Sequence, residues 1–187
     1  HRMSSINTNP IMLRYCIQGK LKTRSPMIIG CGDDDVADIQ FIRDGDGKPL
    51  IPGTTLAGAL RQAAFDLSDN HNILQRCFGQ SVDDAPQSMM IFHDAQLVSD
   101  YAMEIRDGVA IDHITRTAKD TAKYDYETLT KGAEFSFRME LIVRKHDLAA
   151  LRETETELCR ILEYMKQDPG EFAIGAKTNR GFGRVQL

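Results

Sequence analysis

The chain has 187 residues, of which 42% are hydrophobic and 27% are charged, and its formal net charge at pH 7 is −4. This length is enough for one domain with a complete core and is short for two ordinary domains. The negative charge argues against a uniformly basic nucleic-acid-binding protein, but it is compatible with local basic patches. We find no signal-peptide pattern and no run of about 18 apolar residues. We therefore expect a soluble, cytoplasmic protein.

The chain is expected to form a single domain over residues 3–187. Its first three residues, His1-Arg2-Met3, have the character of an expression remnant ahead of a native start. The cysteines are far apart and include no Cys-x-x-Cys pair, which argues against a zinc site and against a compact disulfide framework. They are Cys16, Cys31, Cys77 and Cys159.

The first half of the chain predicts a strand, a helix and a second strand. Residues 10–21 alternate loosely between apolar and polar side chains and end near a glycine, as a strand does. From Leu56 to Leu67 apolar residues recur at spacings of three and four, which predicts a helix with one buried stripe. Thr54 or Thr55 is expected to cap its first turn. Residues 88–98 predict the second strand.

The second half predicts a strand, a helix and a final strand pair. Alternation over residues 133–143 is the clearest strand pattern in the chain. A helix with an apolar stripe follows, capped by Asp147 and ended by the sequence Asp-Pro-Gly at 168–170. The whole order is compatible with a ferredoxin-like α+β fold, in which an antiparallel sheet carries helices on one face.

Between the first predicted strand and the first helix lies an aspartate-rich region. The "DGDG" sequence at 44–47 does not fit a calcium loop, because a glycine at the sixth position would make Ile42 the first ligand. We interpret it as a hairpin turn. Asp33, Asp34 and Asp35 have the pattern of a solvated acidic loop, whereas Asp38 lies between apolar residues just before a strand. A carboxylate in that position is more often held in place.

A second irregular region, residues 106–129, interleaves cations with hydroxyl and aromatic side chains. Arg116, Lys119 and Lys123 are separated by threonines and followed by Tyr124 and Tyr126. Such a mixture suits phosphate contacts and base stacking on a flexible RNA strand. The alternative is an ordinary exposed hairpin, because the lysines also alternate with aspartates.

A third feature is the glycine-rich sequence "GAKTNRGFGRV" at 175–185. Its three glycines permit a bend in which backbone N–H groups and the side chains of Lys177, Arg180 and Arg184 face a phosphate chain. It matches neither a Walker loop nor a Rossmann fingerprint. A plain tight turn is the alternative.

Taken in order, these motifs resemble the RAMP proteins of CRISPR effector complexes, especially the repeated backbone subunit of type III complexes. The resemblance covers nearly the whole chain. It rests on "IIGCGDDD", "ADIQFIRD", "PLIPGTTLAGALR", "RCFGQ", "MIFHDAQL", "AIDHITRTAK", "YETLTKGAEFSF" and "IGAKTNRGFGRV".

The resemblance implies a modified RRM fold with a thumb-like β-hairpin, with insertions at about 22–50 and 99–130. It implies that copies of the chain pack along a guide RNA, together with other effector subunits, and that complementary target RNA is a second partner. The RNA-binding residues expected on this basis are Thr54, Thr55, Gly58, Arg61, Arg116, Lys119, Lys123, Lys177, Arg180 and Arg184.

The resemblance also places Asp38 at the position where type III backbone subunits cut target RNA with a divalent metal. Magnesium or manganese is the expected ion, held by Asp38 with Asp33, Asp34 and Asp35 as further ligand candidates. Three alternatives stay open. One is a RAMP subunit that coats RNA without cutting it, and another is a metal-independent ribonuclease that processes guide RNA through His113 with Lys119 or Lys123. The last is an α+β protein that binds a small molecule and has no RNA role.

Overall fold

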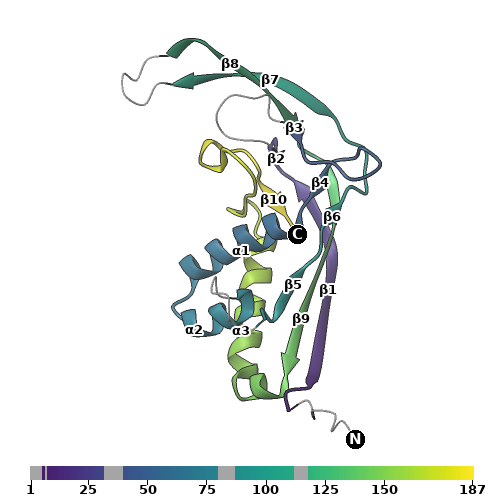
Figure 1. Ribbon diagram of the computed structural model, residues 1–187, viewed down its shortest axis with the longest axis vertical. Helices are drawn as coiled ribbons and strands as arrows, with labels where there is room; N and C mark the ends of the chain where they lie inside the picture. The colour runs from purple at the N-terminus through teal and green to yellow at the C-terminus, as the bar shows by residue number, and fades with distance from the viewer. Residues whose placement is uncertain (1–5, 7, 32–39, 80–86, 112–117) are drawn as a thin grey trace, which may run out of the picture.

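The computed structural model describes residues 6, 8–31, 40–79, 87–111 and 118–187. Its centre is an antiparallel four-stranded sheet in the order β10 (Val185–Gln186), β1 (Ile11–Thr23), β9 (Glu134–Arg144), β5 (Met90–Phe92). β1 and β9 are the long inner strands and pair from Ile11 to Lys22 (Figure 1). Together with the helices this is the ferredoxin-like α+β arrangement expected from the sequence.

Three helices cover one face of the sheet: α1 (Gly53–Leu67), α2 (His71–Phe78) and α3 (Leu151–Lys166) (Figure 1). The predicted alternation of β9 is confirmed, because every second side chain of this strand is at most 1% exposed. Those side chains meet the apolar stripes of the helices in one core, where each fully buried aliphatic or aromatic group contributes about 1.5–3 kcal/mol by leaving water. The β9 set is Phe135, Phe137, Met139, Leu141 and Val143.

A long two-stranded hairpin projects beyond the sheet (Figure 1). It consists of β7 (Met103–Ile111) and β8 (Ala118–Leu129), which pair antiparallel from Met103 opposite Leu129 to Ile111 opposite Ala118. At its base the N–H of Thr130 donates to the carbonyl of Ala102 at 3.0 Å. The thumb-like hairpin that the resemblance implied is therefore confirmed.

The first inserted region forms short strands. Within it, β2 (Gly30–Cys31) pairs with β3 (Gln40–Phe41). At its end, β4 (Leu50–Ile51) pairs with β6 (Ala95–Gln96), which lies before the hairpin in the sequence. Between β3 and β4 the "DGDG" sequence forms the predicted turn. The N–H of Asp44 donates to the carbonyl of Lys48 at 2.8 Å, and Gly47 has a φ of +77°. The hairpin-turn interpretation is confirmed.

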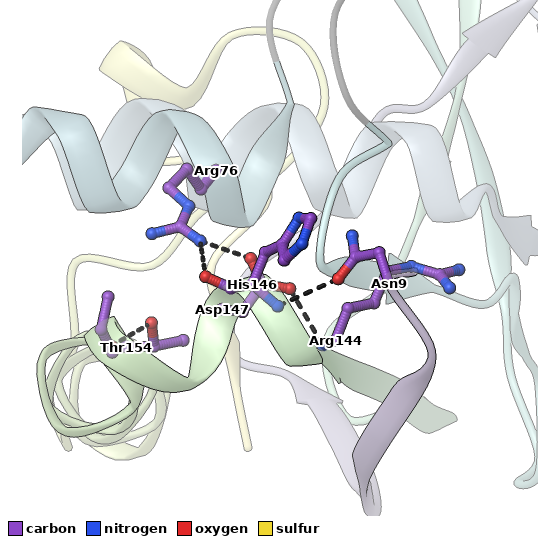
Figure 2. Close-up of polar contacts among 7 residues, drawn as sticks. Asn9, Arg76, Arg144, His146, Asp147 and Thr154 are labelled. Atoms are coloured by element: carbon purple, nitrogen blue, oxygen red, sulfur yellow. Dashed lines mark hydrogen bonds and ion pairs between the residues drawn. The ribbon is translucent and has the colours of Figure 1, made fainter. Parts of the chain in front are cut away.

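The start of the last helix differs from the prediction. The α-helix begins at Leu151, and residues 145–150 form a 3-10 turn before it. Asp147 lies inside this turn, where its carboxylate accepts the N–H of Arg144 at 2.9 Å and pairs with Arg76 of α2 (Figure 2). The predicted cap therefore anchors the turn and ties it to α2. Among the described residues, no helix is long and apolar enough to cross a membrane.

Candidate nucleic-acid interface

Three stretches that are far apart in the sequence meet beside the base of the hairpin. The N–H of Met27 donates to the carbonyl of Leu129 at 2.9 Å, and the reverse bond has the same length. The N–H of Gly183 donates to the carbonyl of Pro26 at 2.7 Å. Residues 26–29 therefore hold the hairpin and the C-terminal glycine-rich turn together. We call this place the junction.

Two glycines make the close approach at the junction possible. Gly175 and Gly183 have φ angles of +87° and +79°, in the left-handed region that side chains disfavour. A Cβ atom at Gly175 would lie 2.1 Å from the carbonyl oxygen of Ile28, and one at Gly183 would lie 1.9 Å from that of Ile174. Ala176 adds a hydrogen bond from its N–H to Ile28 at 2.8 Å. The turn is thus built by backbone packing that only glycine permits.

The three cations of this turn have different surroundings. Lys177, itself in the left-handed region, places its ammonium 4.2 Å from the ring centroid of Tyr126 on β8. Arg184 donates from its guanidinium to the carbonyl of Gly170 at 2.9 Å, so this side chain braces the turn from within. Arg180 is exposed at the tip. Arg180 is therefore the cation that the turn exposes, whereas Lys177 is half-buried against the hairpin.

Aromatic side chains at the junction are used for packing. Tyr126 is only 8% exposed and lies under Lys177. Phe182 of the turn receives the guanidinium of Arg106 from β7 at 5.4 Å from its ring centroid. The interpretation of Tyr126 as a base-stacking residue is wrong, because its ring already packs inside the protein. Cation–π contacts of this kind hold the turn against both hairpin strands.

The aspartate-rich segment leaves the sheet next to the junction. Asp33, Asp34, Asp35 and Asp38 lie outside the described residues, but both ends of their segment are described. Cys31 pairs with Gln40, and the N–H of Ile42 donates to the carbonyl of Ile29 at 3.0 Å. The segment therefore starts and ends directly beyond residues 26–29.

The predicted threonine cap of α1 is wrong. The helix begins at Gly53, and the N-cap residue Pro52 has no side-chain cap. The N–H of Gly53 donates instead to the Oδ1 atom of Asp94 at 2.7 Å. The N–H groups of Thr55 and Leu56 donate to the carbonyl of Pro52. Most backbone N–H groups of the first turn therefore already have hydrogen-bond acceptors, and the Asp94 carboxylate lies at the positive end of the helix dipole.

One face of α1 remains open beyond that cap. Thr54 and Gly58 are exposed, and Arg61 follows one turn later on the same side. A Cβ atom at Gly58 would meet nothing within 4 Å. Arg61 lies over the ring of Phe65, with its guanidinium carbon 4.6 Å from the centroid. Thr55 is half-buried. This face combines a hydroxyl, an uncovered backbone and a positioned cation.

The cations predicted on the hairpin are only partly described. Lys119 and Lys123 belong to β8, where Lys123 stands opposite Val109. Arg116 and His113 lie outside the described residues.

Sequence reasoning missed a carboxylate on the face of the sheet that carries no helices. Glu140 of β9 accepts a hydrogen bond from Nε2 of His93 at 2.9 Å and pairs with Arg14 of β1 at 3.3 Å. The hydrogen bond to His93 and the charge of Arg14 hold the pKa of Glu140 below its usual value, against the opposite effect of its burial. The histidine thus has a structural partner. The pairing of β9 with its neighbours brings these residues together, so the sequence of one strand alone does not reveal the cluster.

No group of three or more His, Cys, Asp or Glu residues within the described ranges is arranged to hold a metal ion. The expected ligands all belong to residues 32–39, which those ranges leave out. Their chemistry fits the expected ion, because carboxylate oxygens are the ligands that magnesium and manganese prefer.

Comparison with solved structures gives the same fold. Two chains of type III-B Cmr-beta complexes match this one, one from the apo state and one from the complex bound to cognate target RNA. Their TM-scores are 0.69 and 0.71, each at 12% sequence identity, and each match covers 92% of this chain and 96% of the other. No curated protein matches. The RAMP superfamily description matches residues 20–186, and the chain therefore belongs to the RAMP superfamily.

Proposed function

We propose that the protein is a backbone subunit of a type III-like CRISPR effector complex, which binds guide RNA and cuts complementary target RNA. The observation that carries the proposal is the junction, where the hairpin base, the glycine-rich turn and the attachment points of the Asp38 segment are hydrogen-bonded together. Membership of the RAMP superfamily supports it. So does the fold shared with a chain from a complex bound to cognate target RNA. Its partners are guide RNA, target RNA, further copies of the chain and other effector subunits.

RNA binding is assigned to two surfaces. The glycine-rich turn offers the exposed guanidinium of Arg180 and the half-buried ammonium of Lys177, while Thr54, Gly58 and Arg61 form the open face of α1. Cations of this kind bind phosphates whatever the base sequence, as a guide-coating subunit requires. Arg184 acts indirectly, because its guanidinium fixes the turn through Gly170.

Salt dependence tests this assignment in the assembled complex. Each phosphate contact on a single strand changes the slope of log K against log salt by about 0.7. We expect Arg180→Gln to lower affinity for guide RNA and to flatten this slope by about one contact. Lys131→Gln, at an exposed turn between β8 and β9, is the matched control and should change neither. An unaltered slope in Arg180→Gln would remove the turn from the interface.

Cleavage is assigned to Asp38. A flipped nucleotide lets its ribose 2′-OH approach the neighbouring phosphorus in line, and such positioning can lower a barrier by roughly 7–11 kcal/mol. The Asp38 carboxylate would accept the hydroxyl proton or orient the attacking group. A magnesium or manganese ion, when bound by Asp38 with Asp33, Asp34 or Asp35, would lower the pKa of that hydroxyl. The expected products carry a 2′,3′-cyclic phosphate and a 5′-hydroxyl.

The test uses the assembled complex with labelled complementary RNA, magnesium and a parallel EDTA sample. We expect Asp38→Ala to abolish cleavage and to leave target binding unchanged. Asp46→Ala is the control, because it removes an exposed aspartate from the same inserted region. Undiminished cleavage by Asp38→Ala would refute the catalytic assignment. Absence of any metal-dependent cutting by the unaltered complex would leave a subunit that only coats RNA.

A further inference from the structure

Arg43 joins the first inserted region to the base of the hairpin. It lies two residues after β3, and its Nη1 atom donates to the carbonyl of Gly47 at 3.1 Å, across the Asp-Gly turn. Its Nη2 atom pairs with a carboxylate oxygen of Glu127 on β8. Within the described ranges, no other ion pair connects these two parts of the chain. We call Arg43 and Glu127 the clamp.

Both partners of the clamp are attached to fixed backbone. On one side, the N–H of Ile42 donates to the carbonyl of Ile29 at 3.0 Å and holds the strand that leads to Arg43. On the other side, Glu127 stands opposite Ile105 in the ladder of the hairpin. The side chains of Arg43 and Glu127 are 34% and 23% exposed. Solvent therefore screens this pair less than it screens a fully exposed surface pair.

The clamp is poorly suited to bind RNA itself. The guanidinium of Arg43 already has two acceptors, and the carboxylate of Glu127 balances its charge. A phosphate would have to displace that carboxylate from the guanidinium. The pair therefore serves the relative position of two elements, β3 and β8, which contact each other at the base of the hairpin (Figure 1).

β3 closely follows the residue to which cleavage is assigned. Gln40, the first residue of β3, is two positions after Asp38, and Arg43 is five positions after it. Five residues of fully extended chain span at most about 18 Å, so Arg43 lies within that distance of Asp38. A shift of β8 relative to β3 would change the distance between Asp38 and any RNA that lies along the hairpin.

We propose that Arg43 is a positioning residue for the cleavage of target RNA and acts through Glu127. The clamp holds the strand after Asp38 against the hairpin, and so keeps the carboxylate at a fixed distance from RNA bound beside the hairpin. A misplacement of about 1 Å in a reacting group can lower a rate about a hundredfold. This inference rests on the cleavage activity proposed above, and it gives the hairpin base a role in the rate of cutting.

The experiment measures cleavage of labelled complementary RNA by the assembled complex with magnesium in a single turnover. Arg43→Gln and Glu127→Gln should each lower the rate constant of the bound complex about tenfold or more and leave target affinity unchanged. The double variant should be no slower than either single variant, because both changes remove the same interaction, whereas independent effects would multiply to about a hundredfold. Arg43→Lys keeps the charge but cannot reproduce both guanidinium bonds, so it should recover part of the rate.

Arg24→Gln is the matched control. It also removes an arginine from an ion pair, with Asp168 at 3.4 Å, but neither residue belongs to β3 or β8, so the cleavage rate should not change. Amide hydrogen exchange then separates positioning from a loss of global stability. In Arg43→Gln the amide of Ile42 should exchange about tenfold faster, while the amide of Ile142 in the central sheet should exchange as before.

The outcomes separate this inference from the proposed function. A wild-type complex that makes no metal-dependent cut would overturn the proposed function, and the inference with it. Normal cutting by Arg43→Gln and Glu127→Gln, in a complex whose unaltered form cuts, would overturn the inference alone. Losses that multiply in the double variant would do the same. So would a parallel loss of target affinity, which indicates an RNA contact, or faster exchange at Ile142 as well, which indicates general destabilisation.

Discussion

Replacing Gly183 by alanine should destabilise the protein far more than replacing its neighbour Gly181. Both residues have positive φ angles, +79° and +87°, and an L side chain in that region costs about 1–2 kcal/mol. A Cβ atom at Gly181 would meet nothing within 4 Å, whereas at Gly183 it would lie 1.9 Å from the carbonyl oxygen of Ile174. Only the second substitution forces the backbone to move.

That movement would disrupt two hydrogen bonds. The N–H of Gly183 donates to Pro26 at 2.7 Å, and its carbonyl accepts the N–H of Ile174 at 2.9 Å. Each bond contributes about 0.5–1.5 kcal/mol net. With the conformational term, Gly183→Ala should lose about 2–5 kcal/mol, against about 1–2 kcal/mol for Gly181→Ala.

Urea unfolding of the isolated chain measures both losses, provided that the slope m stays constant. Gly58→Ala is the internal control, because it lies in an exposed helical position with room for a methyl group. It should stabilise the protein by about 0.5–1 kcal/mol. Equal losses in Gly183→Ala and Gly181→Ala would refute the argument that backbone contact, and not φ alone, requires glycine at the junction.

Three further predictions concern single side chains. Glu140→Gln should lower the free energy of unfolding at pH 7, because the hydrogen bond from His93 lowers the pKa of Glu140 in the folded protein. The difference in stability between wild type and variant should be complete above the unfolded pKa of about 4.5 and should vanish as the pH falls through the folded pKa. Urea titrations at several pH values would measure this difference. Burial, followed by the charge of Glu157, raises the pKa of the Cys77 thiol to about 12. Iodoacetamide at pH 8 should therefore label exposed Cys159 and leave Cys77 unlabelled until urea unfolds the protein. Peptide mapping identifies which cysteine is labelled. Asp94→Ala should cost about 1 kcal/mol of unfolding free energy by uncapping α1, and Asp94→Asn should restore most of it because the amide oxygen can still accept.

The parts of the fold that were predicted correctly are those whose pattern is local and long. β9 shows five alternating apolar side chains, and α1 repeats its apolar residues over four turns. α2 was missed because eight residues are too few to display a helical period clearly. Four strands have only two residues each: β2, β3, β4 and β6. Such strands are defined by pairing with a distant strand, so their own sequence shows no alternation that could predict them.

The candidate site was harder to predict, because its geometry depends on distant residues. The sequence around Thr54 has a local capping pattern, yet the group that caps α1 is Asp94, which is 41 positions from the Gly53 N–H that it accepts. The sequence around Tyr126, with its cations and hydroxyl groups, suggests base stacking on RNA, but the fold places Lys177 over the Tyr126 ring. In both places a tertiary contact replaces the partner that the local pattern suggested.

Asp94 also changes what α1 offers to RNA. With a carboxylate at its first N–H, the helix end is a poor site for a second anion, because the two negative charges would share one positive terminus. Phosphate contacts must then lie further along, where Thr54, Gly58 and Arg61 share a face. Substitution of Gly58 separates helix stability from RNA affinity. An alanine methyl group should stabilise the helix, but it should weaken RNA binding if a phosphate or ribose approaches the bare backbone at this position. A variant that is more stable and binds guide RNA less tightly would place the strand on this face. A variant that gains stability with unchanged affinity would confine the α1 contribution to Thr54 and Arg61.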